Sequence, residues 1–135
     1  MAIGTVGVVG LGTMGAGIAQ VCLEAGHAVI ACDVEQRFVD AGTGRIEAGL
    51  AKRVEKGLME SGAADAARGR LTATTDLGAL SAAELVIEAI VEDLEPKREL
   101  FGRLDGICGA DTILATNTSA PVSYTHLTLP TILLV

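Results

Sequence analysis

The chain of 135 residues has few aromatic side chains: one Tyr, two Phe and no Trp. It also has few positive charges, with 10 Lys and Arg against 17 Asp and Glu, which gives a formal net charge of −7. A surface of this charge repels nucleic-acid phosphates and anionic lipids, so we expect neither nucleic acid nor a membrane surface as a partner. No apolar run approaches the roughly 20 residues that a membrane-spanning helix needs.

Cysteine is scarce as well, with only Cys22, Cys32 and Cys108. An odd number of cysteines without C-x-x-C spacing does not suit a disulfide framework or a zinc site, so we expect no metal. We interpret them as thiols in a reducing compartment, and the cytoplasm is the default expectation. Half of the residues are hydrophobic, so Val, Ile, Leu and Ala must fill the core of a single domain.

Glycine, by contrast, is abundant, and three glycines near the N-terminus carry the strongest motif. Gly10, Gly12 and Gly15 follow a β-branched run and fit the spacing G-x-G-x-x-G. In a dinucleotide-binding loop the first glycine permits a tight turn, the second lets backbone approach a diphosphate, and the third lets helix and sheet pack closely. The diphosphate is then bound by the free N–H groups at the start of the helix that begins near Thr13.

The motif alone is weak evidence for a dinucleotide-binding loop, so the interpretation depends on the elements that surround it. Residues 28–32 read as a second strand, and Asp33 follows this strand, 18 residues after Gly15. A carboxylate at this place is expected to accept hydrogen bonds from the adenosine ribose. From the residues alone, Asp33 could also simply end the strand or cap the next helix. The order of strand, glycine loop, helix, strand and acid favours the dinucleotide interpretation.

The rest of the chain continues the alternation of strands and helices. Hydrophobic patterns predict strands at 3–10, 28–32, 70–75, 85–90 and 112–116, and helices at 13–25 and 94–107. Residues 35–60 are helical in pattern, but Gly42, Gly44 and Gly49 leave open one loose helix or two. In the first helix we expect Met14, Ile18 and Val21 to face the core.

This alternation predicts an α/β fold of the Rossmann type, a doubly wound and mainly parallel sheet with helices on both faces. Ligands of such sheets bind outside the carboxyl ends of the strands. That rule selects the stretches 10–15, 89–93 and 117–119 together with Asp33. A basic group of Lys52, Arg53 and Lys56 is either a solvated helix face or a contact for an anionic substrate tail.

Five blocks of the sequence resemble the 3-hydroxyacyl-CoA dehydrogenases. They are 8–20 (VVGLGTMGAGIAQ), 74–77 (TTDL), 85–94 (LVIEAIVEDL), 97–101 (KRELF) and 113–119 (ILATNTS). Residues 38–40 and 104–108 resemble the bacterial 3-hydroxybutyryl-CoA dehydrogenases in particular. The resemblance implies reversible, NAD-linked oxidation of the 3-hydroxyl of an acyl-CoA, in fatty acid or butanoate metabolism.

The resemblance also implies roles for individual residues. Ser119 would bond the substrate oxygen near the nicotinamide as a catalytic residue, although a plain helix cap is the alternative. Lys56 would meet the phosphates of the coenzyme A nucleotide. The implied NAD-binding residues are Gly10, Leu11, Gly12, Thr13, Met14, Gly15, Asp33, Ala89, Glu92, Lys97, Asn117 and Ser119.

The family's general base, a His in a His-x-x-Asn motif about twenty residues beyond the matched serine, is not in this chain. His126 follows Ser119 by only seven residues and lacks the surroundings of that motif. We therefore expect residues 1–121 to be a truncated NAD-binding domain and 122–135 to be a spurious or disordered tail. The fragment alone would bind NAD with little activity, and its parent would be a homodimer through a missing C-terminal domain.

Two other interpretations stay open. The 3-hydroxyisobutyrate and 6-phosphogluconate dehydrogenases have a nearly identical glycine loop, but residues 88–94 and 117–119 speak against them. A non-catalytic domain that senses NAD would use the same fold. A His-x-x-Asn motif in the continuous gene would favour the enzyme.

Overall fold

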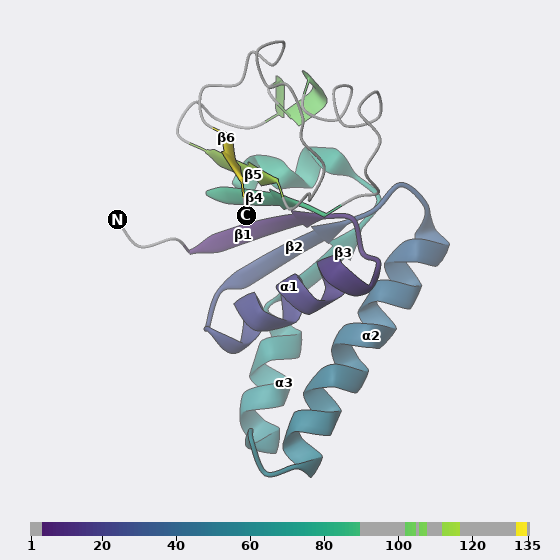
Figure 1. Cartoon of the computed structure of the whole chain (residues 1–135), viewed down its shortest axis with the longest axis vertical. Coiled ribbons are helices and arrows are strands. Elements are labelled where there is room, and N and C mark those ends of the chain that lie inside the picture. Colours follow the sequence, from purple (N-terminus) through teal and green to yellow (C-terminus); the bar gives the residue numbers. More distant parts are fainter. Residues whose placement is uncertain (1–3, 90–101, 105, 108–111, 117–131, 135) are drawn as a thin grey trace.

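The computed structural model describes residues 4–89, 102–104, 106–107, 112–116 and 132–134. Its centre is a six-stranded sheet in which all paired strands are parallel, in the order β3-β2-β1-β4-β5-β6 (Figure 1). The strands are β1 (Thr5–Val9), β2 (Ala28–Cys32), β3 (Leu71–Thr74), β4 (Leu85–Glu88), β5 (Ile113–Thr116) and β6 (Ile132–Leu134). The predicted Rossmann-type, doubly wound fold is confirmed.

Helices cover both faces of this sheet (Figure 1). On one face lie α1 (Thr13–Glu24), α2 (Gln36–Glu55) and α3 (Ser61–Gly69). On the other face lie the 3-10 helix η1 (Leu77–Ala82) and the helical residues 102–104 and 106–107. Among the described residues, no helix is long and apolar enough to span a membrane.

Strand β1 is an interior strand because its side chains supply both hydrophobic cores. Val6 and Val8 pack with the helices of the first face, together with Leu23, Ile46 and Leu50. Val9 belongs to the smaller core of the other face, which also contains Leu80, Val86 and Leu104. A strand that is buried on both faces has a nearly continuous apolar sequence, which is the pattern on which its prediction rested.

The helical pattern of residues 35–60 resolves into one long helix, α2, followed by a turn. Gly42 and Gly49 do not break α2, because each lies where another part of the chain comes close. A Cβ atom at Gly42 would lie 2.5 Å from Cβ of Leu11, and one at Gly49 would lie 2.0 Å from Oε1 of Gln20. Gly42 therefore allows α2 to pack closely against the glycine loop, whereas at Gly49 the close atom is the end of the flexible Gln20 side chain, which can move aside.

The predicted inner face of α1 was wrong in part. Met14 and Val21 are 60% and 66% exposed. The buried residues of α1 are Gly15, Ala16, Ala19 and Leu23, while Ile18 packs against the core from a partly buried position. The physical reason is the close approach of α1 to the sheet: small residues fit between helix and strands, so the large side chains turn outward.

The strand order reverses at the centre of the sheet. The chain moves outward from β1 to β2 and β3, then returns to form β4 on the other side of β1. The carboxyl ends of β1 and β4 thus lie side by side, and their crossovers diverge to opposite faces. In the tail, Ile132–Leu134 pair with β5 as the edge strand β6. The domain boundary at residue 121 stays a prediction.

Candidate functional site

The glycine loop leaves β1 and enters α1 at the point where the strand order reverses. Gly10 has a φ of 99°, a left-handed conformation that favours glycine. Its N–H group donates to the carbonyl oxygen of Cys32 over 2.8 Å, which ties the turn to the end of β2. The first glycine of the motif therefore makes the predicted tight turn.

The other two motif glycines have opposite surroundings. A Cβ atom at Gly15 would lie 1.7 Å from the carbonyl oxygen of Gly10, so only glycine lets the first turn of α1 pack on the loop. A Cβ atom at Gly12 would meet nothing within 4 Å. Gly12 thus borders open space in which the backbone can approach a ligand closely, as the second glycine of a dinucleotide loop must.

The start of α1 offers backbone donors to that space. Gly12 is the N-cap residue of α1 and has no side chain to bond the first N–H groups of the helix, and no acidic residue lies in the first turn. The first intrahelical bond runs from the N–H of Ala16 to the carbonyl oxygen of Gly12 over 2.9 Å. The N–H groups of Thr13 and Met14, which precede Ala16, are therefore available to an anion, and the helix dipole favours negative charge there.

Asp33 lies beside this helix start, held by two backbone groups. Its Oδ2 accepts a hydrogen bond from the N–H of Leu11 over 2.8 Å. Its Oδ1 accepts one from the N–H of Val34 over 2.7 Å. Because both oxygens are fixed by the backbone, the carboxylate stands at a defined place next to the glycine loop, and each oxygen keeps a lone pair for a further donor such as a ribose hydroxyl.

The end of β4 also reaches the loop. The N–H of Ala89 donates to the carbonyl oxygen of Val9 over 2.8 Å. The Cβ of Ala89 would lie 3.6 Å from a Cβ at Gly15, so Ala89 adjoins the first turn of α1. The structure therefore brings together Gly10–Gly15, Asp33 and Ala89, as predicted. Glu92, Lys97, Asn117 and Ser119 lie outside the described residues.

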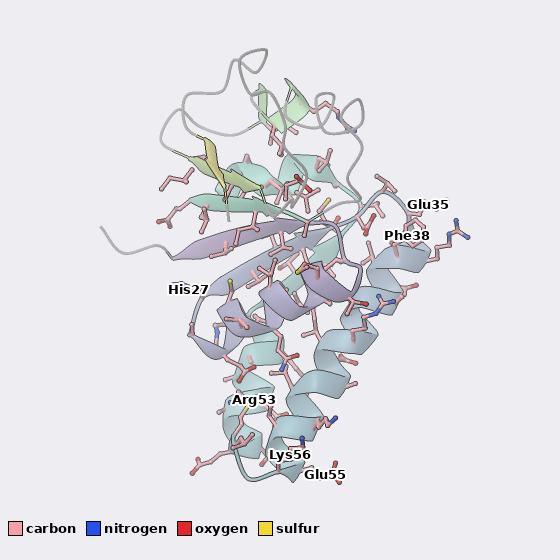
Figure 2. All side chains as sticks on the ribbon, viewed as in Figure 1. His27, Glu35, Phe38, Arg53, Glu55 and Lys56 are labelled. Carbon is pink, nitrogen blue, oxygen red and sulfur yellow. The ribbon has the colours of Figure 1, made fainter. Side chains whose placement is uncertain are left out.

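Lys56 lies apart from this group. It follows the last residue of α2, whereas Glu35 and Phe38 lie at the opposite end of that helix (Figure 2). The 20 residues of α2 rise about 1.5 Å each, so the two ends are about 30 Å apart. Any function of Lys56 therefore concerns a different part of a ligand from the part that meets Asp33.

Two residues that contact the loop were missed in the sequence. Arg45 of α2 donates from Nη1 to the carbonyl oxygen of Leu11 over 3.1 Å. Gly42, one turn earlier, lies against the same residue. A glycine inside a helical pattern is a signal of close approach that was available for Gly42. Nothing in the sequence distinguishes Arg45 from the other charged residues of α2.

The described thiols do not suit catalysis. Burial, together with the nearby carboxylates of Asp33 and Asp76, raises the pKa of Cys32 to about 11, against the opposing effect of Arg103. Burial also raises the pKa of Cys22. Both thiols are free and stay protonated at neutral pH, so neither is an activated nucleophile. Within the described part of the chain, no cluster of three His, Cys, Asp or Glu residues could hold a metal.

The sequence model of the 3-hydroxyacyl-CoA dehydrogenase NAD-binding domain matches residues 5–128. The chain belongs to this family. The match contains the whole glycine loop, Asp33 and Ala89, and it continues into the tail that begins at residue 122. The domain that contains these residues is thus the NAD-binding domain of the 3-hydroxyacyl-CoA dehydrogenases, and the dinucleotide of this domain is NAD.

Similar proteins carry related names. A probable 3-hydroxybutyryl-CoA dehydrogenase of Deinococcus radiodurans is 45% identical over 114 residues, which are 84% of this chain and 41% of that protein. A 3-hydroxyadipyl-CoA dehydrogenase of Escherichia coli is 43% identical over 116 residues, or 86% of this chain and 24% of that protein. The chain therefore spans less than half the length of these curated relatives.

Solved structures agree in fold. The crystal structure of (S)-3-hydroxybutyryl-CoA dehydrogenase from Ralstonia eutropha superposes with a TM-score of 0.88 at 35% identity. The superposition covers 96% of this chain and 46% of that one. A 3-hydroxybutyryl-CoA dehydrogenase structure from Escherichia coli gives a TM-score of 0.90 at 38% identity, over 96% of this chain and 28% of the other.

The described residues of this NAD-binding domain fit the dinucleotide. The diphosphate needs an open approach to backbone N–H groups, which Gly12 and the uncapped start of α1 provide. The adenosine ribose needs an acceptor beside that diphosphate, and the fixed carboxylate of Asp33 would be suited to this role. When bound, NAD would supply the acceptor for a hydride, and the described residues would hold its diphosphate and adenosine ribose.

Proposed function

We propose that this chain is the NAD-binding part of an oxidoreductase that interconverts 3-hydroxyacyl-CoA and 3-oxoacyl-CoA by hydride transfer. The observation that carries the proposal is the 2.8 Å hydrogen bond from the Leu11 N–H to Asp33, beside the open backbone of Gly12. It joins the acceptor for the ribose to the donors for the diphosphate. The names of the relatives support the acyl-CoA substrate.

The catalytic part of the proposal concerns residues after β4 and β5. Ser119 would donate a hydrogen bond to the substrate oxygen near the nicotinamide, where a hydroxyl stabilises the developing ketone or alcohol. Asn117, Glu92 and Lys97 would contact the nicotinamide half of NAD, next to Ala89. The general base would come from chain beyond these 135 residues, so the fragment would bind NAD with little turnover.

The substrate tail would reach the far end of α2. Coenzyme A has nucleotide phosphates at one end of a long pantetheine arm and the acyl group at the other. Lys56 carries a positive charge at the far end of α2, about 21 Å along the helix from Gly42, which packs against the glycine loop. The acyl end of that arm would lie on the nicotinamide side of the site, beyond Ala89. The parent would be a homodimer through a further domain, and free Cys22 and Cys32 favour a reducing compartment such as the cytoplasm.

Titration with NAD and NADP tests the cofactor part. The rigid carboxylate of Asp33 repels a 2′-phosphate, so NAD should bind more tightly than NADP. In Asp33→Asn the charge-assisted bonds are lost, which corresponds to about 1.5–3 kcal/mol, or roughly a 10- to 150-fold weaker affinity for NAD. The matched control is Asp40→Asn, which removes the same charge from an exposed position on α2. A wild-type chain that binds neither cofactor, or prefers NADP, would refute the assignment.

The catalytic part has its own test. We expect the 135-residue chain to turn over 3-hydroxybutyryl-CoA with NAD only at trace rates, followed by NADH absorbance. Robust turnover would show that no further chain is needed and would contradict the proposed missing base. A gene that continues into a His-x-x-Asn motif would support the enzyme, whereas a continuation without it would favour a domain that only senses NAD.

A further inference from the structure

The Leu11 residue between the first two motif glycines is held from three sides. Its N–H donates to Asp33 over 2.8 Å, and its carbonyl oxygen accepts from Arg45 over 3.1 Å. Its side chain is 1% exposed and packs against Gly42 of α2. The residue that follows strand β2 and two residues of helix α2, which are far from the loop in sequence, therefore fix the backbone of Leu11.

This fixation determines where the next N–H points. The peptide bond between Leu11 and Gly12 is planar and trans, as the chain has no cis peptide bonds among its described residues. In a trans peptide, the carbonyl oxygen of one residue and the N–H of the next point in opposite directions. Because Arg45 holds the Leu11 carbonyl toward α2, the Gly12 N–H points away from α2.

Space beside Gly12 is open in the direction in which a Cβ would point, since a Cβ there would meet nothing within 4 Å. We propose that Arg45 is a positioning residue for cofactor binding: its bond to the Leu11 carbonyl holds the Gly12 N–H toward the diphosphate of NAD. Gly42 belongs to the same device, because only a glycine allows α2 close enough to Leu11 for this contact. The inference rests on binding of NAD at the glycine loop.

The surroundings of Arg45 suit this role. The ion pairs in the described part of the chain involve Arg37, Arg53 and Arg68, whereas the hydrogen bond of Arg45 goes to the loop carbonyl. Its positive charge also strengthens that bond relative to a neutral donor. A residue that served only the solubility of α2 would not need to reach a backbone group 34 positions away in sequence.

The test compares Arg45→Met with Arg37→Met by calorimetric titration of NAD and ADP-ribose. Arg37 is a matched control because it is an exposed arginine of the same helix that pairs with Glu35 and lies over the Phe38 ring. We expect Arg45→Met to bind both ligands about five- to tenfold more weakly, and Arg37→Met to stay within twofold of wild type. Equal affinities of Arg45→Met and wild type would overturn the inference.

Two further readouts separate positioning from a simple effect of charge or folding. The weakening by Arg45→Met should be the same at low and high salt, whereas an effect of charge alone would vanish at high salt. The Gly12 amide signal of the free protein, followed by ¹⁵N NMR, should move in Arg45→Met and stay in place in Arg37→Met. An unchanged Gly12 signal, or a loss of affinity only at low salt, would refute positioning.

A second pair of variants tests the same device without removing a charge. Gly42→Ala would place its Cβ 2.5 Å from Leu11 Cβ and 2.8 Å from Leu11 O, so the loop must shift, and NAD affinity should fall several-fold. Gly44→Ala, two residues later in the same helix, meets nothing within 4 Å and should bind NAD as wild type does. Equal binding by the two variants would contradict the inference; failure of the wild-type chain to bind NAD would instead contradict the proposed function.

Discussion

Three glycines of the first helix region should respond to the same substitution, alanine, in three different ways. At Gly15, a Cβ would lie 1.7 Å from the carbonyl oxygen of Gly10 and 2.7 Å from its carbonyl carbon. Neither atom belongs to a flexible side chain, so α1 must move away from the loop by more than an ångström. Overpacking of this kind costs about 1–3 kcal/mol or more, in excess of the roughly 0.5–1 kcal/mol that alanine gains over glycine in a helix.

Gly12→Ala should instead separate binding from folding. Its φ of −66° and ψ of −168° suit alanine, and its Cβ meets no protein atom within 4 Å. The free energy of unfolding should therefore change by less than about 1 kcal/mol. The same methyl group occupies the space through which a diphosphate reaches the backbone, so NAD binding should weaken at least tenfold.

Gly17→Ala is the control, because Gly17 is exposed on α1 and its Cβ also meets nothing within 4 Å. It should bind NAD as wild type does and gain up to about 1 kcal/mol of stability. Urea denaturation and NAD titration of the three variants measure both quantities. If Gly15→Ala proved as stable as Gly17→Ala, or if Gly12→Ala bound NAD normally, the geometry of the loop given above would be wrong.

Two further predictions concern a buried thiol and the basic end of α2. The pKa of Cys32 is raised from its ordinary value of 9.0 to about 11, so the unfolded chain loses this proton first, and stability should fall as pH rises through that interval. The urea midpoints of wild type and Cys32→Ala should therefore converge as the pH rises from 9 to 11. If the two midpoints ran parallel over this pH interval, the raised pKa of Cys32 would be wrong. Lys56→Ala should weaken binding of adenosine 3′,5′-bisphosphate, the nucleotide part of coenzyme A, about two- to threefold in low salt. Titration checks this, and an unchanged affinity would remove Lys56 from the proposed substrate site.

The sequence predicted strands β1 to β5 and helices α1 and α2, because strands buried on both faces and helices with one apolar stripe leave different periodic patterns. It did not predict the edge strand β6. Strand β2 (Ala28–Cys32) has the predicted bounds, and α1 ends at Glu24, close to the predicted residue 25, with Gly26 at a φ of 98° just beyond its C-cap. The orientation of α1 was not predicted correctly. Met14 and Val21 are larger than Ala16 and Ala19, and a rule that places large apolar residues inside fails where helix and sheet come very close.

The residues of the candidate site likewise fall into those that could be predicted from the sequence and those that could not. Gly12, Gly15 and Asp33 could be found from sequence because each has a steric or electrostatic task that only one or two residue types perform. Arg45 could not, because a surface arginine on a helix has many possible partners and the bond to Leu11 exists only once α2 is docked. Gly42 could be predicted in part: a glycine within a helix indicates a close contact, but the sequence does not show that the contact is with Leu11.

Because the strand order reverses at β1, two separate stretches of the chain contribute residues to the candidate site. The groups that fix Asp33 and the glycine loop are the N–H of Leu11 after β1, the N–H of Val34 after β2 and the guanidinium of Arg45 on α2, so all of them come from the first third of the chain. Ala89 reaches the loop from a second stretch, after the chain has crossed to the opposite side of β1. A substitution in the second stretch therefore leaves the contacts among Leu11, Asp33 and Arg45 in place.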